Sequence, residues 1–182
     1  MDTCRWTRAI DEVTTEFEKQ FINLPLELIF KKPDADTWCI AENMLHLIKI
    51  NETYFPIFDG LADGSYRPTW PSKVSFLVNF FGKSILRSVH PDRLKKMKTF
   101  PLWEPVMTEH DPDIFKKFRA HQELLKKHIT GLSSHLDQGV VIHSPANKYL
   151  VYSLETALDI IVTHEKRHFE QSAETLERVR NR

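Results

Sequence analysis

Two histidines near the C-terminus, His164 and His168, are four residues apart in a stretch with helical periodicity. Side chains at positions i and i+4 lie one turn apart on one face of a helix, about 5–6 Å between Cβ atoms, so both imidazoles can reach one divalent ion. The apolar positions Leu154, Ala157 and Ile161 lead to them in steps of three and four residues. The histidines therefore occupy inward positions, where burial is costly unless a metal, a partner residue or water satisfies them.

A third ligand has to come from elsewhere in the chain, because catalytic zinc typically takes three protein ligands and a water or substrate. His46 is the best candidate, since it lies in the middle of the apolar segment 43–48. Inward side chains of facing helices meet inside helix bundles, so one ligand from this segment can join two from the C-terminal helix. The predicted metal ligands are His46, His164 and His168, with Gln171 and Asn43 as candidate hydrogen-bonding neighbours of the ligands.

Residues 164–168 also match the pattern His-Glu-x-x-His, in which zinc peptidases use the glutamate as a general base. Those enzymes supply their third ligand downstream, but residues 169–182 contain no histidine, which argues against a peptidase. Glu165 is still a candidate catalytic residue, because a carboxylate next to a ligand can orient or deprotonate a metal-bound water. The alternative is a surface carboxylate on the helix flank.

The remaining polar residues lack the spacing of metal ligands. His121, His128 and His135 are seven residues apart, about 10.5 Å along a helix, so no two of them can share a metal. We expect these three on a solvated flank. Arg167 could contact an anionic substrate near the metal, but its place on a charged helix favours an exposed ion pair.

Composition limits the classes of partner. Lys+Arg and Asp+Glu both total 25, so nothing supports a nucleic-acid-binding surface or a polybasic membrane anchor. The two cysteines, Cys4 and Cys39, are too few for a disulfide scaffold. The N-terminus lacks the apolar core of a signal peptide, and no run approaches 18 apolar residues. We expect one cytoplasmic domain, residues 1–182, that acts on a small molecule without a nucleic-acid or membrane partner.

Hydrophobic periodicity predicts an all-α, four-helix bundle that positions these residues. The first expected helix covers about 5–30, and the second follows the break at 32–36 and ends near Gly60. The third runs from Asp111 to Leu136, with Asp111 as N-cap and Pro112 as the first helical residue. The fourth runs from Leu150 or Ser153 to Arg178. A short helix from Phe76 to Leu86 and a Pro-rich connection, with one turn around 93–97, form a crossover insertion between the second and third helices. The run 140–142 alone cannot make a sheet, so no strand is expected.

This layout resembles the DinB-like or YfiT-like four-helix-bundle proteins, which bind a divalent metal through three histidines. The segment 38–42, Trp-Cys-Ile-Ala-Glu, followed by His46, is similar to the family's Trp-Ser-x-x-Glu segment and first ligand. His164, His168 and Gln171 are similar to its second motif. Cys39 replaces the serine. Because sulfur is a weak acceptor, we expect Asp36 or Thr37 to cap the second helix.

The resemblance implies that His46, His164 and His168 hold Zn²⁺, Ni²⁺ or a similar divalent ion with an open position. Known members include thiol S-transferases that use bacillithiol or mycothiol, so a low-molecular-weight thiol is the implied co-substrate of a metal-activated transfer, with hydrolysis as the nearest variant. A homodimer is also implied, and the apolar segment 76–86 would suit its interface. Two alternatives stay open: a zincin-like metallopeptidase, and a non-catalytic bundle that metal stabilises.

Overall fold

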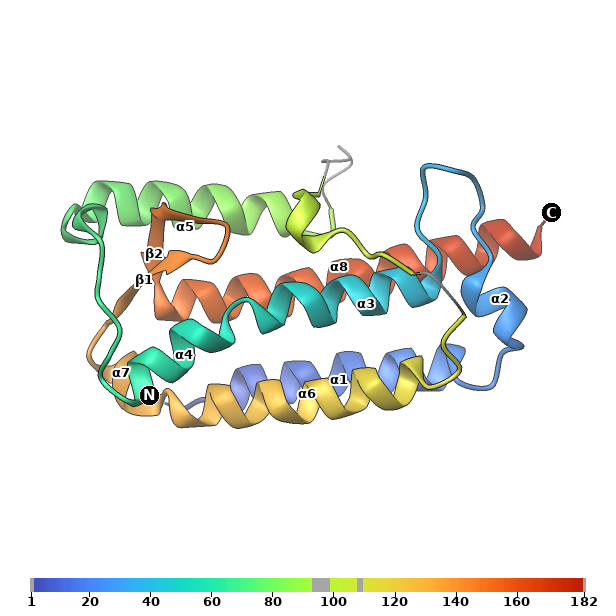
Figure 1. The fold of residues 1–182 in the computed structure, drawn as a ribbon, viewed down its shortest axis with the longest axis horizontal. Coiled ribbons are helices and arrows are strands. Elements are labelled where there is room, and N and C mark those ends of the chain that lie inside the picture. Colours follow the sequence, from blue (N-terminus) through green and yellow to red (C-terminus); the bar gives the residue numbers. More distant parts are fainter. Residues whose placement is uncertain (1, 93–98, 108–109, 182) are drawn as a thin grey trace.

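The protein is an all-α bundle in a computed structural model that describes residues 2–92, 99–107 and 110–181. Helix α1 (Cys4–Phe21) lies beside α6 (Ile114–Gly131) in one layer, and α3 (Ile40–Glu52) and α8 (Leu154–Arg180) form the layer above it (Figure 1). Helix α5 (Ser75–Val89) packs on the opposite side of α8. The four-helix bundle with a crossover helix is therefore confirmed.

The stripe on α1 shows how the sequence drives this packing. Its buried residues recur every three or four positions, as one helical face requires: Trp6, Ile10, Val13, Phe17 and Phe21. The ring of Phe17 lies 5.0 Å from that of Phe118 on α6 and 5.4 Å from that of Phe169 on α8, measured between centroids. One aromatic residue thus joins three helices of the bundle.

Prolines shorten two of the predicted helices. Helix α1 ends at Phe21 rather than near residue 30, and Pro25 begins a separate α2 (Leu26–Phe30). The second predicted helix is divided into α3 and α4 (Phe55–Ala62), because Pro56 has no N–H to continue the helical hydrogen bonds. Helix α3 therefore stops at Glu52, six residues beyond His46, which lies at its middle.

The third predicted helix is also shorter at both ends. Helix α6 begins at Ile114, because the Asp111 carboxylate accepts a hydrogen bond from the Asp113 N–H and closes a turn before the helix starts. Its continuation to Leu136 is a separate short helix, α7 (Ser133–Asp137). The predicted N-cap role of Asp111 is thus wrong by two residues.

The cap of α3 corrects another prediction. Cys39, and not Asp36 or Thr37, is the N-cap: its Sγ accepts a hydrogen bond from the Glu42 N–H at 3.4 Å. The Glu42 carboxylate accepts one from the Cys39 N–H at 2.9 Å, which completes a capping box. Even a weak sulfur acceptor serves here because both groups are buried and the reciprocal bond fixes the geometry.

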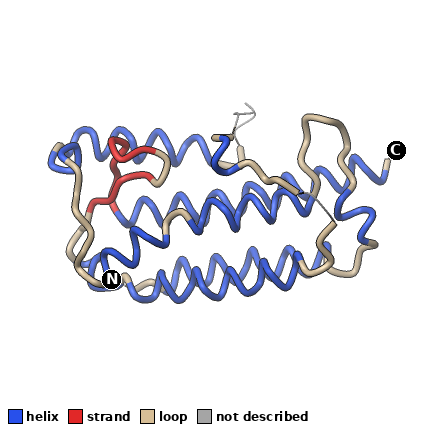
Figure 2. The backbone as a smooth tube through the Cα atoms, in the orientation of Figure 1, coloured by secondary structure: helices blue, strands red, loops and turns tan. Residues whose placement is uncertain are grey.

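A β-hairpin at the entrance to α8 contradicts the expectation of no strand. Strand β1 (Val141–Ser144) pairs antiparallel with β2 (Asn147–Ser153), with Ile142 opposite Tyr152 (Figure 2). Strand β2 packs against α5, so the hairpin is stabilised by a long-range contact that a local pattern does not reveal. Ser153 then caps α8, its Oγ accepting a hydrogen bond from the Thr156 N–H at 3.0 Å.

The crossover insertion contains more ordered structure than its prolines suggested. Helix α5 extends to Val89, and two 3₁₀ turns, η1 (Trp70–Lys73) and η2 (Pro101–Trp103), flank it. The turn predicted around 93–97 lies outside the described residues. Within the described part of the chain, no helix is long and apolar enough to cross a membrane. The homodimer stays a prediction, although Phe76 and Phe80 of α5 are exposed, as residues of such an interface would be.

Candidate metal centre

Three histidines from two helices meet in the middle of the bundle. His46 comes from α3, and His164 and His168 come from successive turns of α8. One potential ligand atom of each lies within 4.8 Å of the other two. The two histidines of α8, four residues apart, and the inward histidine of α3 thus bring their side chains together at one point.

Hydrogen bonds to the outer ring nitrogens fix two of the imidazoles. His46 Nδ1 is 2.8 Å from the carbonyl oxygen of Trp103, and His168 Nδ1 is 2.7 Å from the Asn43 side-chain oxygen. Both acceptors require a proton on Nδ1, which leaves Nε2 with a free lone pair. A hydrogen bond of this kind is the usual support of a metal-ligating histidine, and it also orients the ring.

The Nε2 atoms of His164 and His168 face each other. His164 Nε2 and His168 Nε2 are 3.0 Å apart, a distance that requires a proton or a cation between them because two lone pairs repel. Two nitrogens bound to one tetrahedral Zn²⁺ at 2.0–2.1 Å would be about 3.3 Å apart. The three-histidine group therefore fits a divalent ion.

Electrostatics keep the three imidazoles neutral, which is the form that binds metal. Burial lowers the pKa of His46 to about 4. Burial, followed by the neighbouring histidines and Arg167, holds the pKa values of His164 and His168 well below the usual range. At neutral pH each ring therefore offers a lone pair without first losing a proton.

Aromatic side chains cover the cluster. The Trp38 ring, just before α3, lies 4.8 Å from the His46 ring and 5.8 Å from the His168 ring, measured between centroids. Trp103, whose carbonyl holds His46, comes from η2 in the crossover insertion. The hydrogen bond from His46 to this carbonyl was not predicted from the sequence, because every residue of the Pro-rich loop has a backbone carbonyl.

A cavity of about 930 Å³ opens beside the histidines, and Asn43 and Gln171 both line it. Arg167 also lines it, and this residue is half-buried rather than on an exposed flank as expected. Its guanidinium donates hydrogen bonds to the carbonyls of Ser88 and His90 at the C-terminal end of α5. A cation suits that position, because helix carbonyls carry partial negative charge there.

Glu165 lies outside the lining of the histidine cavity, and it is not the surface carboxylate of the alternative prediction. Its side chain is fully buried and accepts hydrogen bonds from Asn51 Nδ2 at 2.8 Å and from Gln122 Nε2 at 2.5 Å. Burial raises the pKa of this carboxyl to about 7. The carboxylate does not line the histidine cavity, so the peptidase reading loses its general base. One residue along a helix is a rotation of about 100°, which already separates Glu165 from the face of His164.

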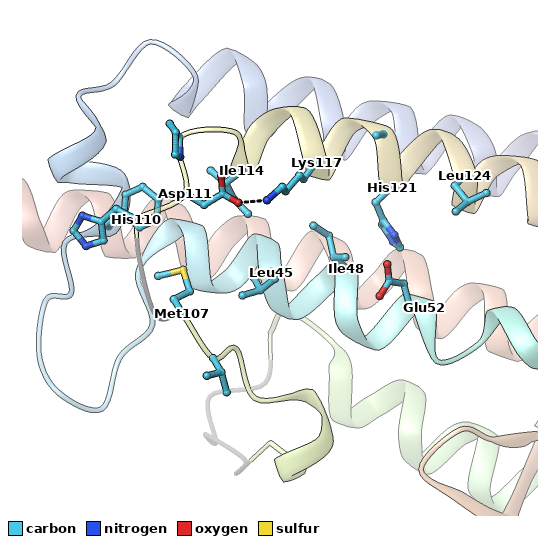
Figure 3. A pocket seen from close by; sticks show the side chains of 14 residues that line it. Leu45, Ile48, Glu52, Met107, His110, Asp111, Ile114, Lys117, His121 and Leu124 are labelled. Atoms are coloured by element: carbon cyan, nitrogen blue, oxygen red, sulfur yellow. Dashed lines mark hydrogen bonds and ion pairs between the residues drawn. The ribbon is translucent and has the colours of Figure 1, made fainter.

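His121 is likewise buried, contrary to the expected solvated flank. Its side chain lines a second cavity, of about 750 Å³, between α3 and α6, and its ring points toward Glu52 (Figure 3). His121 is only 6% exposed, and no described residue hydrogen bonds to either of its ring nitrogens. The ring stacks on Phe55, as does that of His128. An aromatic packing role explains both histidines better than a metal.

Replacement of this buried histidine should stabilise the protein. At pH 7.5 we expect His121→Leu to add about 1–3 kcal/mol to the free energy of unfolding, because an unsatisfied polar group is removed. Burial lowers the pKa of His121 to about 4 from its ordinary 6.5, so the unfolded chain binds the proton first as the pH falls. Wild-type stability therefore declines below pH 6.5, and the advantage of the variant should grow by about 1 kcal/mol at pH 5.5.

Urea denaturation of both proteins at pH 7.5 and pH 5.5 measures this difference. A variant that is less stable than wild type, or an advantage that is the same at both pH values, would show that His121 is satisfied in solution.

The Asn43 side chain should matter for metal affinity. We expect Asn43→Ala to weaken Zn²⁺ binding by about 10- to 100-fold, because the proton on His168 Nδ1 loses its acceptor and the ring loses its orientation. Asn43→Asp is the matched control, since it keeps an oxygen at that position. Competition titration with a chelator measures both, and equal affinities for the Ala variant and wild type would contradict the role.

Comparison with known proteins agrees with this geometry. The family model described as the DinB superfamily matches residues 9–172, which is most of the chain and includes all three histidines. No curated protein and no solved structure matches the chain. The family match confirms the resemblance carried by the tryptophan segment and the two histidine motifs.

Proposed function

This chain belongs to the DinB superfamily, and we propose that it is a metal-dependent enzyme that transfers a low-molecular-weight thiol to a small molecule. The proposed cofactor is Zn²⁺ or Ni²⁺, held by His46, His164 and His168. The observation that carries the proposal is the cluster of three neutral imidazoles on the wall of a cavity large enough for a substrate.

The ligand set supports catalysis rather than a purely structural role. Structural zinc sites are closed by four protein ligands, whereas catalytic sites keep a position open. Among the described residues, no fourth histidine, cysteine or carboxylate joins the three. A bound divalent ion would lower the pKa of a thiol or a water in that open position toward neutrality and so supply a nucleophile.

The surrounding residues have defined tasks in such a reaction. Asn43 and the Trp103 carbonyl hold the imidazoles in position, and Trp38 excludes water from one side of them. In the transfer, the thiolate sulfur forms a bond to an electrophilic carbon of the substrate. The leaving group departs with its electron pair, and the thiol proton passes to solvent. The positive charge of Arg167, on the cavity wall, favours the thiolate over the thiol.

A thiol-conjugation screen on protein of known metal content tests the proposal. The Zn²⁺-loaded chain is mixed with bacillithiol, mycothiol or glutathione and an aryl halide, and product formation is followed. We expect conjugation above the uncatalysed rate with at least one thiol, and its loss in His46→Ala. Hydrolysis of a test ester without conjugation would instead indicate the hydrolytic variant, and no metal-dependent reaction of either kind would contradict an enzymatic function.

A further inference from the structure

The histidines divide their cavity into two ends of different polarity. Helix α8 runs along the cavity and contributes residues from Ile160 to Arg178 to its lining. Ile160 and Ile161 precede the histidines, whereas Gln171 and Glu174 follow them. At 1.5 Å per residue, the step from Ile161 to Glu174 spans about 20 Å, so the two ends are well separated.

The end before the histidines is walled by aliphatic side chains from four elements, which we name the apolar chamber. They come from α3, α5, β2 and α8: Ile50, Ile85, Val89, Leu150, Ile160 and Ile161. Aliphatic walls of this kind bind a ligand by removing its apolar surface from water.

The side chains of four polar residues at this end of the cavity are already hydrogen bonded within the protein. The hydroxyls of Tyr54 and Tyr152 hydrogen bond to each other at 2.9 Å. The Asn51 amide donates to Glu165, and the Ser88 hydroxyl donates to the carbonyl of Ile85 at 2.6 Å. These groups therefore offer little to a charged ligand, which would lose its hydration on entering the chamber.

The opposite end of the cavity carries charge. Asp36 and Glu174 line it together with Gln171. Arg178 also lies there, but its guanidinium is paired with Asp34 and donates a hydrogen bond to Thr37. A polar or charged part of a ligand is stabilised at this end by these side chains.

We propose that the substrate of this centre carries an uncharged alkyl or aryl arm, which lies in the apolar chamber beside the three histidines. The inference rests on the proposed function, because it takes the histidines to hold the metal at which the substrate reacts. It specifies the substrate class: molecules whose reacting group is attached directly to an apolar group.

Alkyl hydroxamates test this class, because their head group binds a metal with an open position and their chain can be lengthened. Affinities of aceto-, butano-, hexano- and octanohydroxamate for the Zn²⁺-loaded chain are measured by isothermal titration calorimetry. We expect affinity to rise about three- to fourfold for each added CH₂ until the chamber is filled. Suberic acid monohydroxamate, with a terminal carboxylate on a chain of the same carbon number as octanohydroxamate, should bind at least about tenfold more weakly than octanohydroxamate.

Two variants of α5 locate the effect. Ile85→Gln, in the chamber, should reduce the gain in affinity with chain length, whereas Leu77→Gln, which is also half-buried on α5 but does not line the cavity, should leave it unchanged. Equal affinities for all four hydroxamates in wild type would overturn the chamber assignment while the metal centre stands. If the chain retains no Zn²⁺ and even acetohydroxamate does not bind, the proposed function itself would be overturned.

Discussion

His168→Ala should abolish tight divalent-metal binding, with a loss of affinity for Zn²⁺ of at least about 100-fold. The variant removes one of three imidazoles and leaves Asn43 and His164 without the ring that joins them. Wild type should retain about one ion per chain after dialysis, and the variant none. A ligand that binds only the folded state stabilises that state. Free Zn²⁺ at 1,000 times the wild-type Kd should therefore add about 4 kcal/mol to the free energy of unfolding of wild type and almost nothing to that of the variant.

His135→Ala is the matched control, since this half-buried histidine is outside the cluster and reports any non-specific binding to histidine. Metal content by mass spectrometry and thermal melts with and without Zn²⁺ give the readout. If His168→Ala retains one ion per chain and the same metal-dependent rise in melting temperature, the cluster is not the site.

Glu165→Ala should be the most destabilising single change near the centre, at about 2–5 kcal/mol, while leaving the metal stoichiometry at one per folded chain. The carboxylate is fully buried, and its removal leaves the amide donors of Asn51 and Gln122 without an acceptor in the core. Three helices lose a shared contact, because these residues come from α8, α3 and α6. Urea denaturation of the metal-free proteins measures the change.

Glu165→Gln separates this structural role from catalysis. The Gln122 side-chain oxygen is buried and has no hydrogen-bond partner among the described residues, so a flip of that amide would let it accept a hydrogen bond from the new glutamine. We therefore expect Glu165→Gln to keep most of the stability and the full conjugation rate. Peptidase activity in wild type that disappears in Glu165→Gln would contradict this account and restore the His-Glu-x-x-His reading.

Much of the bundle was predictable because its determinants are local. The stripe from Trp6 to Phe21 follows one helical face, and the four-residue spacing of His164 and His168 fixes their common direction regardless of the rest of the chain. His46 was recoverable because a polar residue in the middle of an apolar helical segment needs a partner. The family match then covers the same positions.

What the sequence could not supply depends on contacts between distant segments. The hairpin is stabilised by the packing of β2 on α5, a helix far away in the sequence. The hydrogen bond that supports His46 is made by the backbone carbonyl of Trp103, 57 positions away. A backbone group is the same in every residue, so the residue type at this position does not predict the bond. Burial of His121 likewise depends on Phe55, which α4 brings against α6.

The central claim is that His46, His164 and His168 together hold one divalent ion. Anomalous diffraction at the Zn absorption edge, from crystals grown with one equivalent of Zn²⁺, tests it most directly. The account predicts a single peak per chain among the three rings, about 2.0–2.1 Å from each ligating nitrogen. A peak bound by other residues, or no peak between these histidines, would contradict it.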